Sequence, residues 1–184
     1  VFYAVKANPS RWVIETLVES GVTGFDVASL GEIELVRSVS PDARLAFMHP
    51  VKSRGAITRA YFEHGVRTFS LDSHDELAKI LDATGNANDL NLLVRMTVSA
   101  DGAAYTLSGK FGVSVDQAPS LLLATRQAVR DGLMGVCFHV GSQCMRPSAY
   151  EAAMAQVGRA ISRAGVFVDI VDVGGGFPSV YPGM

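Results

Sequence analysis

Seven apolar segments of the chain each end on a titratable residue or on a cluster of glycines. In chain order these ends are Lys6, Asp26, His49, Asp72, Arg95, His139 and the run Gly174-Gly175-Gly176. An amine, carboxylates, imidazoles and a guanidinium held close together can form imines, move protons and bind anions. A single polar residue at such a position is weak evidence, but a series of seven endings predicts a shared functional site.

Lys6 follows the apolar and aromatic residues Phe2-Tyr3-Ala4-Val5. One interpretation is a lysine whose stem packs along a strand while its ammonium group reaches water. The other is a desolvated amine suited to forming an imine with a carbonyl compound. The pattern of apolar residues by itself leaves both interpretations open.

The three consecutive glycines Gly174, Gly175 and Gly176 directly follow the apolar run Val168–Val173. Successive backbone N–H groups in such a turn form an anion-binding nest, and the missing side chains let a phosphate approach closely. A tight turn that needs positive φ is the alternative, although three glycines exceed that need. No phosphate-loop motif and no dinucleotide-binding motif is present, which argues against an ordinary nucleotide fold.

Four further residues are candidates for the same site. His139 is interpreted as a core histidine, an acid/base group, a metal ligand or a flat ring that stacks on a cofactor; no second His or Cys lies at metal-ligand spacing, so we predict no metal site. Ser142 follows closely and could bind a phosphate or phenolic oxygen. Arg95 lies in an apolar run and is expected to pair with an anion, because burying it unpaired is costly. Glu32 forms a capping-box pattern with Ser29, so a structural role is as well supported as a catalytic one. Ser73 and Glu76 repeat this capping-box pattern.

The elements that must position these residues alternate regularly along the chain. The predicted strands are Phe2–Lys6, Gly24–Val27, Arg44–Met48, Thr68–Leu71, Asn91–Met96, Gly135–Val140 and Val168–Val173. Helical patterns separate them, and the strands are almost uninterrupted apolar runs, as in parallel sheets buried on both faces. Repeats of this kind predict an α/β fold, a (β/α)8 barrel with seven of its eight strands present, whose active site lies at the carboxyl ends of the strands. The long irregular segment Thr97–Gly112 is either a functional loop or a disordered one.

Composition narrows the function class. The 184 residues are 48% hydrophobic with a net charge of −2, which argues against nucleic-acid or membrane-surface binding. No apolar run approaches the roughly 20 residues of a membrane span, and no secretory signal is evident. Two cysteines, Cys137 and Cys144, are predicted to be reduced thiols of a cytoplasmic protein. Because the chain begins within a strand pattern without Met, we expect residues 1–184 to be a barrel segment truncated at both ends.

Five motifs together resemble the fold type III pyridoxal-phosphate decarboxylases, the group of ornithine and diaminopimelate decarboxylases. They are Tyr3-Ala4-Val5-Lys6-Ala7-Asn8, Gly24-Phe25-Asp26-Val27-Ala28-Ser29 with Glu32, Lys110-Phe111-Gly112, Phe138-His139-Val140-Gly141-Ser142 and Asp172-Val173-Gly174-Gly175-Gly176-Phe177-Pro178. The resemblance covers nearly the whole chain in the family's order. The glycine motif favours the ornithine branch, whereas Gln143 is shared with the diaminopimelate side.

The resemblance implies a fold, a cofactor and roles for individual residues. The fold would be the barrel of the alanine racemase type. Lys6 would carry pyridoxal 5′-phosphate as an internal aldimine and His139 would stack on its ring, which makes these two the catalytic residues. Ser142 and Gly174–Gly176 would hold the phosphate or its neighbourhood. Asp26, Glu32 and Arg95 would line the pocket.

The implied activity is decarboxylation of ornithine, possibly lysine, to a diamine in polyamine biosynthesis, by a homodimer when full length. The chain departs from the family because it lacks the Glu-Pro-Gly-Arg motif of the eighth strand, whose Glu pairs with the ring nitrogen, and the C-terminal β-domain. We therefore predict that residues 1–184 alone are inactive. The alternatives are a diaminopimelate or arginine decarboxylase, a non-catalytic regulator of the antizyme-inhibitor kind, and a single-domain pyridoxal-phosphate barrel.

Overall fold

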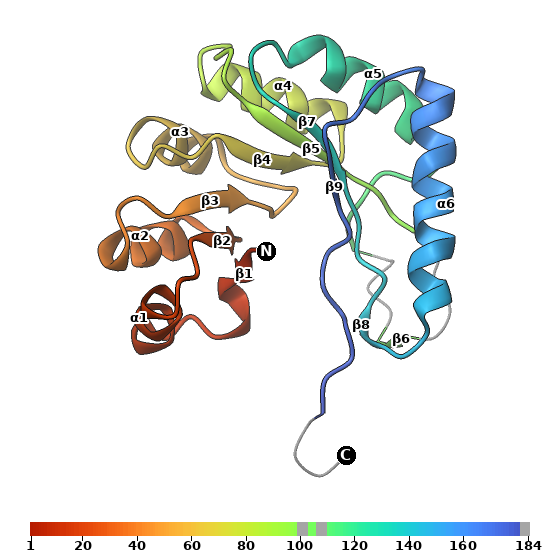
Figure 1. Ribbon diagram of the computed structural model, residues 1–184. Helices are drawn as coiled ribbons and strands as arrows, with labels where there is room; N and C mark the ends of the chain where they lie inside the picture. Colours follow the sequence, from red (N-terminus) through yellow and green to blue (C-terminus); the bar gives the residue numbers. More distant parts are fainter. Residues whose placement is uncertain (99–102, 106–109, 181–184) are drawn as a thin grey trace.

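The chain folds into one curled parallel sheet with helices along its outside, as the computed structural model shows (Figure 1). The structure describes residues 1–98, 103–105 and 110–180. The sheet runs, in chain order, through β1 (Tyr3–Ala4), β2 (Gly24–Val27), β3 (Arg44–Phe47), β4 (Thr68–Leu71), β5 (Asn91–Arg95), β7 (Met134–Cys137) and β9 (Ile170–Asp172). Within the described residues β9 does not pair with β1, so the sheet is an open barrel with seven of the eight strands of a closed one. The predicted fold class is confirmed.

The helices lie between successive strands in the sequence and pack against the outside of the sheet. They are the short 3₁₀ helix η1 (Val5–Ala7), α1 (Arg11–Glu19), α2 (Leu30–Val39), α3 (Arg54–Phe62), α4 (His74–Ala83), α5 (Ala118–Ala128) and α6 (Pro147–Ala164). Neither the helices of residues 1–98 nor those of 110–180 include one that is long and apolar enough to cross a membrane.

The core lies between the strands and these helices. Alternate strand residues such as Phe25 and Phe69 are fully buried, and so are helix residues such as Ile33 and Ile80. Each of these large side chains stabilises the fold by about 1.5–3 kcal/mol when removed from water. The opposite strand residues, among them Asp26, face the inside of the curl because successive side chains alternate across a sheet.

Serine caps fix where the helices begin. The hydroxyl oxygens of Ser29, Ser53 and Ser73 accept hydrogen bonds from the third residue of α2, α3 and α4 at 3.3, 3.2 and 3.2 Å. Each cap follows a strand closely, so it sets the length of the loop at the carboxyl end of that strand. The helix starts predicted at Ser29 and Ser73 are thus confirmed. The reciprocal half of each capping box is replaced, because Glu32 accepts from the N–H of Ala28 and Glu76 from that of Lys52.

Three predicted strands are clearly longer than the observed ones. β1 ends at Ala4, and Lys6 lies in η1, where the N–H of Asn8 bonds to the carbonyl of Val5 at 3.1 Å. β7 ends at Cys137, so His139 lies two residues beyond it, and β9 covers only Ile170–Asp172. Apolar runs report burial, and burial continues beyond the sheet: Val5 is completely buried within the turn.

An additional two-stranded antiparallel ladder was not predicted. It joins β6 (Ala103–Tyr105) to β8 (Ser142–Cys144). β8 contains the polar residues Ser142 and Gln143, so it lacks the apolar signal that marks the barrel strands. Parts of the segment Thr97–Gly112 lie outside the described residues, and its predicted role as a loop falls there.

Candidate active site

The sheet register brings most of the candidate residues to one rim. Ala4 of β1 lies opposite Asp26 of β2, and Lys6 follows Ala4 by two residues. Across the curl, Arg95 of β5 lies opposite Cys137, which lies opposite Asp172 of β9. Parallel strands carry all these positions to the same end, the carboxyl end of the barrel, where such folds build their sites.

Lys6 lies on this rim in the turn of η1 and is exposed. Of the two interpretations drawn from the sequence, this exposure agrees with an amine that reaches water, and the role of Lys6 in imine formation stays a prediction. Among the charged groups, Lys6 has the largest effect on the pKa of Asp26, which its positive charge lowers. A nucleophilic amine beside a carboxyl group is a usable pair for proton transfer.

The pKa of Asp26 is raised from 3.8 to about 6. Burial is the largest cause; the positive charge of Lys6 opposes it, and the negative charges of Asp172 and Glu32 add to it. A carboxyl group that titrates near neutral pH can both hold and release a proton under working conditions.

His139 is held as a neutral ring facing the same rim. Its Nδ1 accepts a hydrogen bond from the N–H of Gly141 at 2.9 Å. Its pKa is lowered, first by burial and then by the positive charges of Lys6 and Arg95, against the charge of Asp172. The uncharged imidazole offers a flat face, as a stacking role requires.

The glycine turn packs directly against His139. A Cβ atom at Gly174 would lie 2.5 Å from the carbonyl oxygen of Phe138, and one at Gly176 would lie 1.9 Å from that of Gly141. Both glycines have positive φ, of 70° and 88°, so glycine is needed for space as well as for conformation. The N–H of Gly174 donates to the carboxylate of Asp172 at 2.8 Å, which ties the turn to the end of β9.

Arg95 lies over an aromatic ring. Its guanidinium lies 5.6 Å from the centre of the Phe111 ring, and among the described residues it forms no ion pair. No carboxylate of the described residues forms an ion pair with Arg95, and pairing with the anion of a bound ligand stays a prediction. The charge of Arg95 still influences Asp26 and His139. A guanidinium over an aromatic face gains a cation–π attraction while it stays available to a ligand.

His49 and Asp72 contact the segment Lys110–Gly112 through a ring contact and a hydrogen bond. The His49 ring meets the Phe111 ring edge-on, with 5.0 Å between centroids. The carboxylate of Asp72 accepts a hydrogen bond from the N–H of Gly112 at 2.9 Å. These two strand-end residues therefore hold the Phe111 that lies beneath Arg95, rather than facing the centre of the site.

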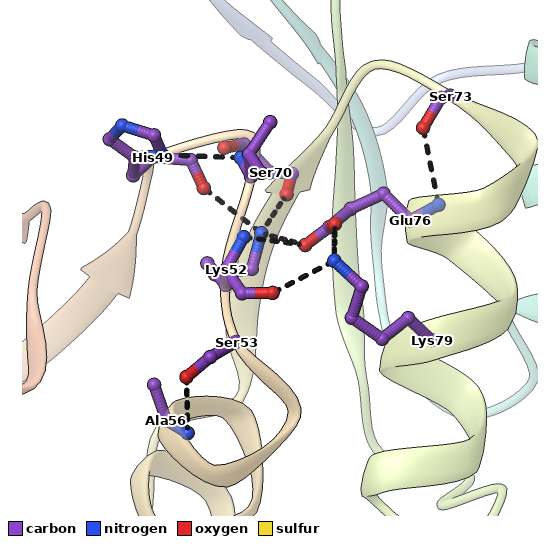
Figure 2. A network of polar contacts seen from close by, with 9 residues as sticks. His49, Lys52, Ser53, Ala56, Ser70, Ser73, Glu76 and Lys79 are labelled. Carbon is purple, nitrogen blue, oxygen red and sulfur yellow. Dashed lines mark hydrogen bonds and ion pairs between the residues drawn. The ribbon is translucent and has the colours of Figure 1, made fainter.

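A buried charge network between the loop after β3 and the start of α4 was missed by sequence analysis (Figure 2). The ammonium of Lys52 is fully buried and lies 3.0 Å from the carboxylate of Glu76, with bonds of 2.9 and 2.6 Å to the carbonyl oxygens of His49 and Ser70. Lys79 also contacts Glu76. Glu76 was interpreted only as a capping residue, and its pairing with Lys52 had no sequence signal because the two residues are far apart in the chain.

Two remaining candidates, and one residue that was not predicted, can be placed. Glu32 accepts a hydrogen bond from the N–H of Ala28 at 2.7 Å, which supports its structural interpretation, while its charge also raises the pKa of Asp26. Ser142 begins β8, directly after the Gly141 that packs on Gly176. Asp172 was not proposed for the site, yet it follows the same rule of strand ends and influences the charge of both Asp26 and His139.

The arrangement fits a phosphorylated aromatic carbonyl compound. The rim supplies an amine at Lys6 and a neutral ring at His139. The turn at Gly174–Gly176 provides backbone without side chains beside that ring. Each of these features meets a separate part of such a ligand: carbonyl, aromatic ring and phosphate.

Comparisons with known proteins agree with this geometry. The model of the pyridoxal-dependent decarboxylase family, pyridoxal-binding domain, matches residues 1–183. A lysine/ornithine decarboxylase of Selenomonas ruminantium is 38% identical over 97% of the chain and 45% of its own length. Antizyme inhibitor 2 of Xenopus laevis is 35% identical over 96% of the chain and 38% of its own length.

A solved structure gives the same result. The crystal structure of an SrLDC variant in complex with PLP has a TM-score of 0.82 and 35% identity, covering 97% of this chain and 46% of that one. The chain therefore spans a little under half the length of the relatives it matches.

Proposed function

This chain belongs to the pyridoxal-dependent decarboxylase family, whose cofactor is pyridoxal phosphate, and from that membership we propose that it is the barrel segment of an enzyme that decarboxylates ornithine, and possibly lysine, to a diamine. The observation that carries the proposal is the rim itself. Lys6, Asp26 and Arg95 share it with His139, which packs against the glycine turn.

Each residue has a task that its surroundings suit. Lys6 would hold the cofactor's carbonyl carbon through its Nζ. His139 would lie against the ring as an uncharged plane. The turn Gly174–Gly176 would hold the phosphate with the N–H groups of Gly175 and Gly176 and the hydroxyl of Ser142, while the N–H of Gly174 stays bonded to Asp172. When bound, the cofactor supplies an electron sink for the pair left behind as CO2 departs.

Asp26 would manage a proton at this rim. Its carboxyl oxygen has a pKa of about 6 and lies within the influence of Lys6, so it can take a proton from the Lys6 ammonium when the free amine is needed. Arg95 and Glu32 would set the charge around this exchange. The acidic partner of the ring nitrogen and the groups that choose the substrate would come from the remainder of a longer protein.

We also propose the setting of the whole protein: a cytoplasmic homodimer that takes part in polyamine biosynthesis, of which residues 1–184 form the barrel segment. Two buried free cysteines, Cys137 and Cys144, suit a reducing compartment. The share of the relatives' length that the chain spans supports its being a segment. The same family fold leaves arginine and diaminopimelate as alternative substrates.

A non-catalytic regulator is the second candidate, because antizyme inhibitor 2 is nearly as similar to this chain as the decarboxylases are. Lys6 and the closely packed turn beside His139 argue for the enzyme, since a regulator has no need for a place to hold the cofactor.

The test uses the full-length protein. Purified protein with added pyridoxal phosphate is assayed for CO2 and for the amine formed from ornithine, lysine, arginine and diaminopimelate. Lys6→Ala and Lys6→Arg should both abolish turnover and the visible absorbance of lysine-bound cofactor. The arginine variant keeps the positive charge beside Asp26, so it separates bond formation from electrostatics. Wild-type protein that binds no cofactor and forms no amine would refute the enzyme and favour the regulator.

A further inference from the structure

Gln143 has an unusual backbone for a residue with a side chain. Its φ is 52°, and Asn86 is the only other non-glycine residue with positive φ in the described part of the chain. This left-handed conformation costs a non-glycine residue roughly 1 kcal/mol or more, and it persists where the surroundings impose it. A glycine at position 143 would avoid the cost, so the glutamine side chain calls for a reason.

The side chain forms a two-point contact with one peptide segment. Its amide nitrogen donates to the carbonyl oxygen of Ser179 at 2.8 Å, and its amide oxygen accepts from the N–H of Ser179 at 2.8 Å. A primary amide carries a donor and an acceptor side by side, which matches the two polar groups of one residue's backbone. Glutamate cannot donate and alanine can do neither.

This contact fastens the chain just after the glycine turn. The neighbouring residue of β8, Cys144, donates its N–H to the carbonyl oxygen of Gly176 at 2.8 Å. Gly141, two residues before Gln143, lies so close to Gly176 that no Cβ atom would fit between them. Residues 141–144 therefore contact the segment 176–179 at two positions: Gly176, through close packing on Gly141 and the bond from Cys144, and Ser179, through the side chain of Gln143.

The left-handed backbone at Gln143 directly precedes Cys144, whose N–H bonds to Gly176. Gly141, also at positive φ (111°), and Gln143 bend the chain so that the N–H of Cys144 faces Gly176. We therefore interpret the strained conformation and the side-chain contact together, as features that fix the position of the glycine turn against His139.

We propose that Gln143 is a positioning residue for the phosphate-binding turn Gly174–Gly176. It fixes the exit of the turn through Ser179 and so sets the direction of the turn's N–H groups. This inference rests on the proposed function, because it assumes that the phosphate of the cofactor lies at that turn. Gln143 itself need not touch the phosphate.

The experiment compares two ligands on the full-length, cofactor-free protein: pyridoxal 5′-phosphate and pyridoxal, which lacks the phosphate. Gln143→Ala should lower the affinity for pyridoxal 5′-phosphate about tenfold, because each lost hydrogen bond changes an affinity by a factor of roughly two to ten. Pyridoxal should bind Gln143→Ala as it binds wild type. A general loss of structure would lower the affinities for pyridoxal 5′-phosphate and pyridoxal equally.

Two further variants separate the side chain from the backbone. Gln143→Gly relieves the φ of 52° but loses the contact, and should weaken the phosphorylated ligand as Gln143→Ala does. Gln143→Glu keeps the acceptor and loses the donor, and should also weaken it. Gln127→Ala, in an exposed position of α5, is the matched control and should bind both ligands normally. Hydrogen exchange over residues 174–179 should accelerate in Gln143→Ala and stay at the wild-type rate in Gln127→Ala.

The outcomes distinguish the two proposals. Wild-type protein that fails to bind pyridoxal phosphate would overturn the proposed function. Wild-type protein that binds it, together with a Gln143→Gly variant that binds it equally well, would overturn only the role of Gln143. Equal weakening of both ligands would also overturn that role, since it would mark Gln143 as a general stabiliser.

Discussion

The N–H of Gly141 points at Nδ1 of His139 and donates a hydrogen bond of 2.9 Å to it. This nitrogen must therefore be an acceptor, so the neutral ring carries its proton on Nε2. A proton on Nδ1 would break this bond. Separately, burial first and then the positive charges of Lys6 and Arg95 lower the pKa of His139.

We expect His139 to remain neutral to a lower pH than an unfolded histidine does. The unfolded chain binds this proton first as pH falls below about 6.5, so the folded state loses stability through that range down to the folded pKa of His139. Proton–nitrogen NMR of the cofactor-free full-length protein, with His139→Gln used to assign the signal, measures it. A titration midpoint at or above that of a histidine peptide would contradict the prediction.

Asp26→Asn should stabilise the cofactor-free protein at pH 8. The pKa of Asp26 rises from 3.8 unfolded to about 6 folded, mainly through burial, so ionised Asp26 destabilises the folded state above pH 6. At about 1.4 kcal/mol for each unit, the gain is on the order of 3 kcal/mol. The difference between the variants should shrink as pH falls from 6 to 4, because wild-type Asp26 then becomes neutral too.

Urea unfolding of wild-type protein and Asp26→Asn at pH 8, 6 and 4 checks this, since other titrating groups cancel in the difference. A gain that stays constant across these pH values would show that the substituted amide improves packing and that the charge of Asp26 has no part in it.

Gly176→Ala should abolish binding of pyridoxal phosphate. Its Cβ atom would meet the carbonyl oxygen of Gly141 at 1.9 Å, and its φ of 88° disfavours a side chain, so the turn must move away from His139. Gly175→Ala is the control within the same turn: its nearest contact would be 3.9 Å, to the His139 ring. The melting temperature should fall for Gly176→Ala and stay nearly unchanged for Gly175→Ala. Equal melting temperatures for the two would refute the steric argument.

The sequence predicted the barrel because each barrel strand is an apolar run, and the site because Lys6, Asp26, Arg95 and His139 follow such runs. The residues at which the strands end were predicted less accurately. Apolar residues mark burial, which Val5 retains in a turn after the strand has ended.

Contacts between distant segments left no local signal. Lys52 and Glu76 come from separate βα units and were not paired from sequence. The contact of Gln143 with Ser179 likewise depends on a backbone angle that no pattern of residue types reveals. Sequence patterns therefore brought Lys6, Asp26, Arg95 and His139 to one rim but missed Asp172, and the structure was needed to see what supports them.

Lys52→Met should destabilise the protein strongly. Lys52 is buried, and burial lowers its pKa while Glu76 opposes that effect. Removing the ammonium leaves the carbonyl oxygens of His49 and Ser70 without their donor and weakens the charge balance of Glu76. Breaking a buried pair from one side costs about 3–5 kcal/mol, and Lys79, which also contacts Glu76, should keep the loss near the lower figure.

The double variant Lys52→Met with Glu76→Gln should lose less than the two single variants added together, because the uncompensated charge is gone. Arg163→Met is the control from an exposed ion pair, Arg163 with Asp116 at 3.1 Å, and should change stability by about 0.5 kcal/mol or less. Urea midpoints of wild type, the two single variants and the double variant give the coupling. Strict additivity of the two single variants would mean that Lys52 and Glu76 do not act as a pair, and the network would then stabilise the rim only through its bonds to the backbone.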